Sequence, residues 1–107
     1  IMKRHILEIN EANVDITDIY YIIRAKGQTS SGGYSDPELV FEKNGSIDTT
    51  VTDLVLDFIA DDEHAFLTVL SPIQAELKLE RSKFPNLRSV TIIAETNKKT
   101  ITIKEIE

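Results

Sequence analysis

The 107-residue sequence contains no cysteine, and this absence excludes several kinds of site. Without thiols there is no disulfide framework, no thiolate nucleophile and no cysteine-ligated zinc or iron–sulfur centre. Histidine is also scarce, with only His5 and His64. A serine nucleophile needs a histidine base and a third group that orients it, and no G-x-S-x-G turn is present to display a serine. We therefore expect a protein that is not an enzyme and that needs no cofactor.

Positive charge is in the minority, because 12 Lys and Arg residues stand against 18 Asp and Glu residues, for a net charge of −6. Binding to nucleic acid or to an anionic membrane depends on basic side chains that displace counterions from phosphates. We expect neither as a partner. Glu8 and Asn10 interrupt the apolar run near the start, so the sequence predicts no signal or membrane segment. The expected location is the cytoplasm, which the lack of cysteine allows.

Alternation of apolar and polar residues with period two is the dominant pattern, and it predicts β-strands. In "DLVLDFIAD" (53–61), one face of the strand would carry Leu54, Leu56, Phe58 and Ala60. Further strands are predicted, in order along the chain, at 3–9, 17–25, 38–43, 89–95 and 100–106. The last of these looks like an edge or terminal strand with an outward row of threonines. Asn44-Gly45 is a strong signal for a tight hairpin turn.

Residues 71–83 carry two conflicting signals. Ser71, Pro72 and Gln74 match the start of a capped helix, which would give an α+β fold with a helix at 71–83. The apolar residues instead alternate strictly, and a helix would scatter them around its axis: Ile73, Ala75, Leu77 and Leu79. Periodicity favours a strand here. We predict one domain over 1–107 that folds as an antiparallel all-β sandwich of about seven strands, Ig-like or related, with at most one short helix.

Clustered acidic residues are the first candidates for chemistry. Asp61, Asp62 and His64 are candidate metal ligands in "ADDEHA", but consecutive residues rarely converge on one ion, and the spacing of known calcium and zinc motifs is absent. We predict a solvated turn there and no functional metal. Carboxylates that alternate with apolar residues are typical of the wet face of a strand and give no specific sign of acid–base catalysis: Asp53, Asp57, Glu76 and Glu80.

The segment "AKGQTSSGGYSDPEL" (25–39) holds three of the four glycines, around Tyr34. One interpretation is a sandwich crossover, with Tyr34 on the edge of the core and Asp36-Pro37 at the start of the next strand. The other is a binding loop that displays the tyrosine among small polar side chains. The candidate binding residues are then Gln28, Thr29, Ser31, Tyr34 and Asp36.

The same segment carries a resemblance. "GQT" (27–29), "GY..P.L" (33–39), "SPIQAE" (71–76) and "AETN" (94–97) resemble a group of small uncharacterised bacterial proteins, which tend to have tryptophan in place of Tyr34. The resemblance spans about residues 23–97. It implies a single-domain bacterial protein and carries no activity, cofactor or catalytic residue.

The expected function is a non-enzymatic module that binds another protein or itself. The contact would use the 27–37 loop or an exposed sheet edge, which can accept an extended segment as an extra strand. The alternative is an accessory domain that binds a small molecule or a carbohydrate through Tyr34.

Overall fold

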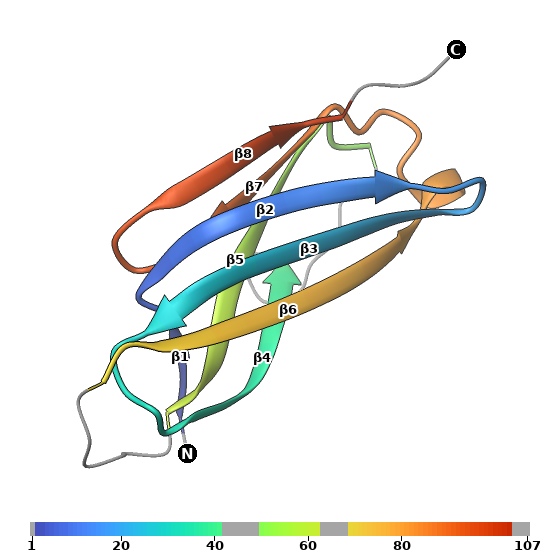
Figure 1. Ribbon diagram of the computed structural model, residues 1–107. Coiled ribbons are helices and arrows are strands. Elements are labelled where there is room, and N and C mark those ends of the chain that lie inside the picture. The colour runs from blue at the N-terminus through green and yellow to red at the C-terminus, as the bar shows by residue number, and fades with distance from the viewer. Residues whose placement is uncertain (1, 42–49, 63–68, 104–107) are drawn as a thin grey trace.

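The computed structural model describes residues 2–41, 50–62 and 69–103. These residues form eight strands and one short 3-10 helix, arranged as two facing sheets (Figure 1). The strands are β1 Met2–His5, β2 Glu8–Ile16, β3 Tyr20–Thr29, β4 Tyr34–Phe41, β5 Asp53–Asp62, β6 Ser71–Glu80, β7 Ser89–Ile93 and β8 Lys98–Thr102, and the 3-10 helix η1 is Arg81–Lys83. The prediction of an all-β sandwich is confirmed. The predicted Asn44-Gly45 turn lies outside the described residues.

The smaller sheet has the order β2-β3-β6 and is antiparallel throughout. In the larger sheet β5 is central. It pairs with β4 along one edge, and its other edge is shared by β7 and β1, which take successive halves. β8 follows β7 as the outer strand, as expected for the terminal run. The expectation of purely antiparallel pairing was wrong at one place, because β5 and β7 are parallel. The intervening strand β6 lies in the other sheet, so the chain returns to β5 in the same direction.

Residues 71–80 form a strand, and the alternative of a helix over 71–83 is wrong. The residues expected on one face of this strand do lie toward the core, while Gln74 and Glu76 between them are exposed. Only the single turn at η1 is helical. Pairing with β3 over ten residues outweighs the capping signals at the start of the segment, because tertiary packing overrides local propensity.

The core lies between the sheets and is continuous. The predicted inner face of β5 is confirmed, because its four apolar residues are all buried. Tyr21, Ile23 and Ala25 of β3 face them from the opposite sheet, and Val90 and Ile92 of β7 lie beside them in the same sheet. At about 25 cal/mol per Å² of apolar surface, this burial is the main stabilising term.

Two segments near the start differ from their predictions. Residues 17–19 are a turn and not the beginning of a strand, because the Thr17 hydroxyl accepts hydrogen bonds from the N–H groups of Ile19 and Tyr20. The predicted strand at 3–9 is divided between the sheets, and β2 continues to Ile16. Within the described ranges, no helix is long and apolar enough to cross a membrane.

Candidate functional site

The glycine-rich segment connects the two sheets. β3 of the smaller sheet ends at Thr29, and β4 of the larger sheet begins at Tyr34, so residues 30–33 form the crossover. Gly27 lies within β3, where a methyl group would overlap the Glu8 carbonyl oxygen and come within 2.5 Å of the Ile6 side chain. A glycine is therefore required at this position by the close approach of β2, and not by an unusual backbone angle.

Thr29 and Ser31 hold the crossover together. Thr29 is 1% exposed, and its hydroxyl donates to the Ser31 carbonyl at 2.7 Å, with the Ser71 carbonyl at 3.4 Å. Gln28 is half-buried, and its carbonyl accepts a hydrogen bond from the Leu7 N–H at 3.0 Å. The backbone and hydroxyl groups of this part of the candidate loop are thus already engaged within the chain.

Tyr34 is half-buried and packs against the core, opposite Asp62 of β5. Asp36 has a φ of 50°, which asparagine and aspartate tolerate better than most residues, and it forms a bulge in β4 together with Pro37. Tyr34 lies at the edge of the core, as in the crossover interpretation, but β4 begins at Tyr34, so the prediction that Asp36-Pro37 starts the strand was wrong. The five candidate residues do not converge on a common cavity: Thr29 points into the core, and the Asp36 side chain is 69% exposed.

Lys3 lies at the centre of an acidic group on the outer face of the larger sheet. Its ammonium nitrogen lies 2.9 Å from Asp36 and from Glu38, and 3.4 Å from Asp61. It also donates to the Asp36 carbonyl at 3.0 Å. Hydrogen bonds to the Asp36 and Glu38 carboxylates raise the pKa of Lys3 above its ordinary value. This cluster fixes the β4 bulge to β1.

The structure separates the metal candidates. Asp61 faces outward to Lys3, whereas Asp62 is buried and lies 3.1 Å from Arg4, because successive residues of β5 point to opposite sides. The predicted turn at 61–62 is instead the end of β5, and His64 lies outside the described residues. Among the residues that the structure describes, no group of three possible ligands could hold a metal ion.

The four alternating carboxylates lie on opposite sides of the sandwich. Asp53 and Asp57 are on the outer face of β5, where they contact Ser89 and His5 at 2.5 and 2.8 Å. On the other sheet, Glu76 contacts Arg24 at 2.8 Å, and Glu80 lies 3.8 Å from Lys83. No two of these four carboxylates face each other across a shared site.

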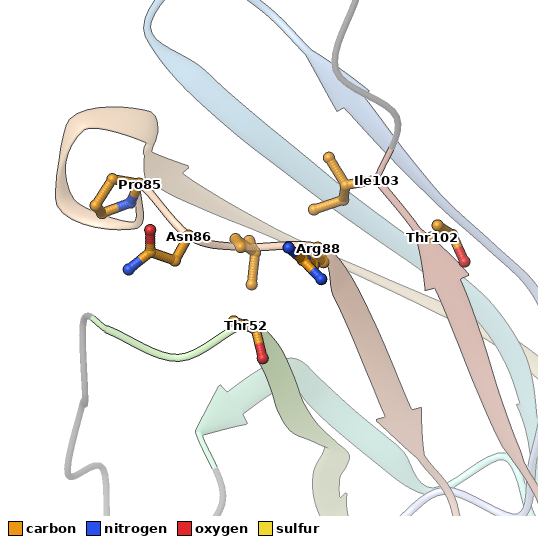
Figure 2. A pocket seen from close by; sticks show the side chains of 7 residues that line it. Thr52, Pro85, Asn86, Arg88, Thr102 and Ile103 are labelled. Atoms are coloured by element: carbon orange, nitrogen blue, oxygen red, sulfur yellow. The ribbon is translucent and has the colours of Figure 1, made fainter.

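A hollow of about 500 Å³ lies at the end of the sandwich where β7 begins and β8 ends, and Figure 2 shows the side chains that line it. Its lining includes Thr52, Asn86, Arg88 and Thr102. Among the described residues of that lining, Arg88 provides the only charge, and its backbone N–H donates to the Thr52 carbonyl at 2.7 Å. These residues place no acid beside a base, and we assign the hollow no chemistry.

Two other hollows lie along β6. One of about 660 Å³ is bordered by Lys26, Gln28, Pro37 and the first residues of β6, and one of about 360 Å³ lies between Arg24 and Glu76. Both adjoin β6, which is an outer strand of its sheet (Figure 1). The unpaired side of this strand offers a row of backbone hydrogen-bonding groups that no described strand uses.

The outer strands β2, β4 and β8 each carry a feature that hinders strand addition. The Asn97 amide takes up both backbone groups of Ile9 in β2, at 2.8 and 2.9 Å, next to a bulge. β4 carries its own bulge at Asp36-Pro37, and β8 has only five residues, beginning with two lysines. Bulges, prolines, lysines and short length are the usual means by which proteins block strand addition. β6 has ten residues in unbroken register with β3, and its single proline is near its start.

The direction of the β6 backbone groups follows from its register. The Arg81 N–H donates to the Ile19 carbonyl, which continues the β3–β6 ladder and makes this a hydrogen-bonded pair. Such pairs alternate along an antiparallel ladder, so odd-numbered residues of β6 bond to β3 and even-numbered residues point away. The outward N–H groups belong to Gln74, Glu76, Lys78 and Glu80, all of which are exposed. Within the described ranges, no other strand pairs with this side.

The strict alternation of apolar residues predicted the strand β6, but it could not indicate the free edge, which depends on which strands become neighbours. Comparison with protein-family models, with curated proteins and with solved structures found no match.

Proposed function

We propose that this protein is a non-catalytic binding module that accepts an extended polypeptide segment along the free edge of β6. The observation that carries the proposal is the row of four outward N–H groups on a long, regular strand. An extended segment would pair with these groups as an additional strand, which is a general mode of peptide recognition. The reducing cytoplasm is a suitable location for such a chain without cysteine.

The side chains of β6 support the same proposal. Ile73, Ala75 and Leu77 face the core but are only half-buried, because none of the described strands lies beyond them in their sheet. An added strand would cover them further, and this burial would add to the backbone hydrogen bonds. The hollow beside Pro72 and Gln74 gives a side chain of the added strand a place to lie.

A phage library of random ten-residue peptides, selected on the immobilised protein, provides the test. Enriched peptides are expected to shift the amide NMR signals of the even-numbered β6 residues. The variant Gln74→Pro removes one outward N–H group and leaves the β3 ladder intact, so it should weaken binding at least about tenfold.

The matched control is Thr102→Pro. The Ile103 N–H donates to the Arg88 carbonyl, which continues the β7–β8 ladder and makes the Thr102 amide point away from β7. This variant should bind like the parent. Enriched peptides that shift residues elsewhere and ignore Gln74→Pro would contradict the proposal. A sugar or divalent cation that raises the melting temperature, while no peptide binds, would instead favour a small-molecule function.

A further inference from the structure

The β6 edge has a charge pattern that is complementary to itself. Its outward-pointing residues read Pro72, Gln74, Glu76, Lys78 and Glu80, so one cation lies between two anions. We propose that the segment that pairs with β6 is the β6 strand of a second copy of this chain, in an antiparallel dimer with a two-fold axis at Leu77. This inference rests on the proposed function, since it uses the same edge.

With the axis at Leu77, Glu76 of each copy lies opposite Lys78 of the other, and Gln74 lies opposite Glu80. These are hydrogen-bonded pairs, because the backbone groups of all four residues point outward. Every one of these N–H groups therefore meets a carbonyl group. Opposite charges that face each other across strands stabilise the pair, and here they do so twice because of the symmetry.

Other registers lose this complementarity. An axis at Glu76 places that carboxylate against itself, and an axis at Lys78 places two lysines together and Glu76 against Glu80. An axis at Ala75 pairs no opposite charges and leaves the Glu80 N–H groups without a partner. An axis between two residues would pair odd-numbered with even-numbered residues. The apolar face of one copy would then lie on the same side of the joined sheet as the charged face of the other. An axis at Leu79 also pairs opposite charges, Lys78 with Glu80, but it places Gln74 and Glu76 opposite residues beyond the end of β6. Only the axis at Leu77 combines opposite charges with partners for all four outward N–H groups.

The contacts already present in one copy fit this arrangement. Glu76 is bound by Arg24 of β3 at 2.8 Å, so a row of alternating charge would continue from Arg24 through Glu76 to Lys78 of the second copy. On the core side, Leu77 would lie beside its own symmetry mate and Ala75 beside Leu79. The two smaller sheets would join into one sheet of the order β2-β3-β6-β6-β3-β2.

The first test is a disulfide at the axis, which is unambiguous because the chain has no cysteine of its own. Residues in a non-hydrogen-bonded antiparallel pair have Cα atoms about 4.5 Å apart, within the range of a disulfide. Leu77→Cys should therefore form a covalent dimer on mild oxidation. The control Ala75→Cys lies on the same strand and face, but its symmetry mate is four residues along, roughly 13 Å away, and it should not cross-link. Equal cross-linking of both variants, or none of Leu77→Cys, would overturn the register.

The second test exchanges the charges. Glu76→Lys and Lys78→Glu each place like charges opposite each other at both symmetric positions, so each variant should dimerise at least about tenfold more weakly than the parent, as measured by light scattering after gel filtration. An equimolar mixture of the two variants restores opposite charges at both positions and should form the heterodimer. Circular dichroism shows whether each variant is folded. A parent chain that stays monomeric at about 1 mM, the millimolar limit of weak association, or a mixture that stays monomeric, would refute the dimer.

The two proposals fail separately. Lys78→Glu is expected to be monomeric with a free edge, so the peptide selection is repeated on this variant. Peptides that bind its β6 edge, together with a monomeric parent, would leave the proposed function standing and remove the second copy as the occupant. A dimer that persists in both charge variants would show association through another surface and overturn the inference.

Discussion

Replacement of Gly27 by alanine should destabilise the protein strongly, although the same change in a strand usually has the opposite effect. A Gly→Ala substitution without strain stabilises a protein by about 0.4–1 kcal/mol, because it restricts the unfolded chain. At Gly27 the added methyl group would overlap the Glu8 carbonyl oxygen, which is backbone and cannot rotate away. β2 would have to move outward by roughly 1 Å to reach ordinary contact distance.

The size of the effect can be worked out from the contacts that depend on this approach. Overpacking typically costs about 1–3 kcal/mol. The outward movement would also strain the hydrogen bond from Leu7 to Gln28 and the two bonds between Ile9 and Asn97, each worth about 1 kcal/mol. After the entropic gain is subtracted, we expect a net loss of about 3 kcal/mol. This corresponds to a fall of about 15 °C in melting temperature for a domain of this size.

Gly32→Ala provides the matched control. A methyl group at Gly32 would meet only the Ser71 hydroxyl oxygen, at 3.6 Å, which is an ordinary contact. We expect this variant to lie within about 1 kcal/mol of the parent, on the stable side. Urea titration followed by far-ultraviolet circular dichroism measures both variants. A loss below about 1 kcal/mol for Gly27→Ala, or equal effects of the two substitutions, would refute the close-approach argument.

Three further predictions concern the contacts around this segment. Asn97→Ala removes both hydrogen bonds to the buried Ile9 backbone, and we expect urea titration to show a loss of about 2 kcal/mol. Tyr34→Ala should cost about 2 kcal/mol of stability by the same assay, because the ring packs against the core. The control Tyr20→Ala, on the outer face, should cost less than about 1 kcal/mol. Equal losses would mean that the Tyr34 ring is displayed to solvent and not packed. Lys3→Met leaves three carboxylates without their shared cation, so the variant should gain more stability from added NaCl than the parent does. Folding raises the pKa of Lys3, so its contribution to the free energy of unfolding is complete below about pH 10 and is lost only above that pH. The loss of stability in Lys3→Met should therefore be equal at about pH 7 and pH 9.

Alternation was sufficient to predict the strands whose two faces differ most. β5 and β6 carry uninterrupted rows of apolar residues on the core side, and these rows decided β6 against its helix-like start. β2 was missed beyond residue 9, although Ala12, Val14 and Ile16 also alternate with polar residues. Its apolar residues are only half-buried, and a bulge near its start interrupts the period.

Features that depend on neighbours were not predictable from the sequence. The parallel pairing of β5 and β7 results from the passage of β6 through the other sheet. The free edge of β6 likewise depends on topology, because β7 and β8, the later strands that the structure describes, both join the other sheet. Asn97 belongs to the "AETN" segment, but its amide became significant only once the fold placed it beside Ile9. The period of the sequence specifies which face of a strand is buried, whereas the neighbours of that strand in its sheet are decided by the topology of the whole fold.

The hydrogen bonds between Ile9 and Asn97 have a consequence for how the protein is made. They join positions 88 residues apart, so synthesis must pass residue 97 before β2 can be fixed at its bulge. Contacts of such long separation are slow to form, because the entropy of loop closure is lost before they stabilise anything. During synthesis the outer edge of β2 therefore stays unpaired at Ile9 until the turn between β7 and β8, which carries Asn97, has been made.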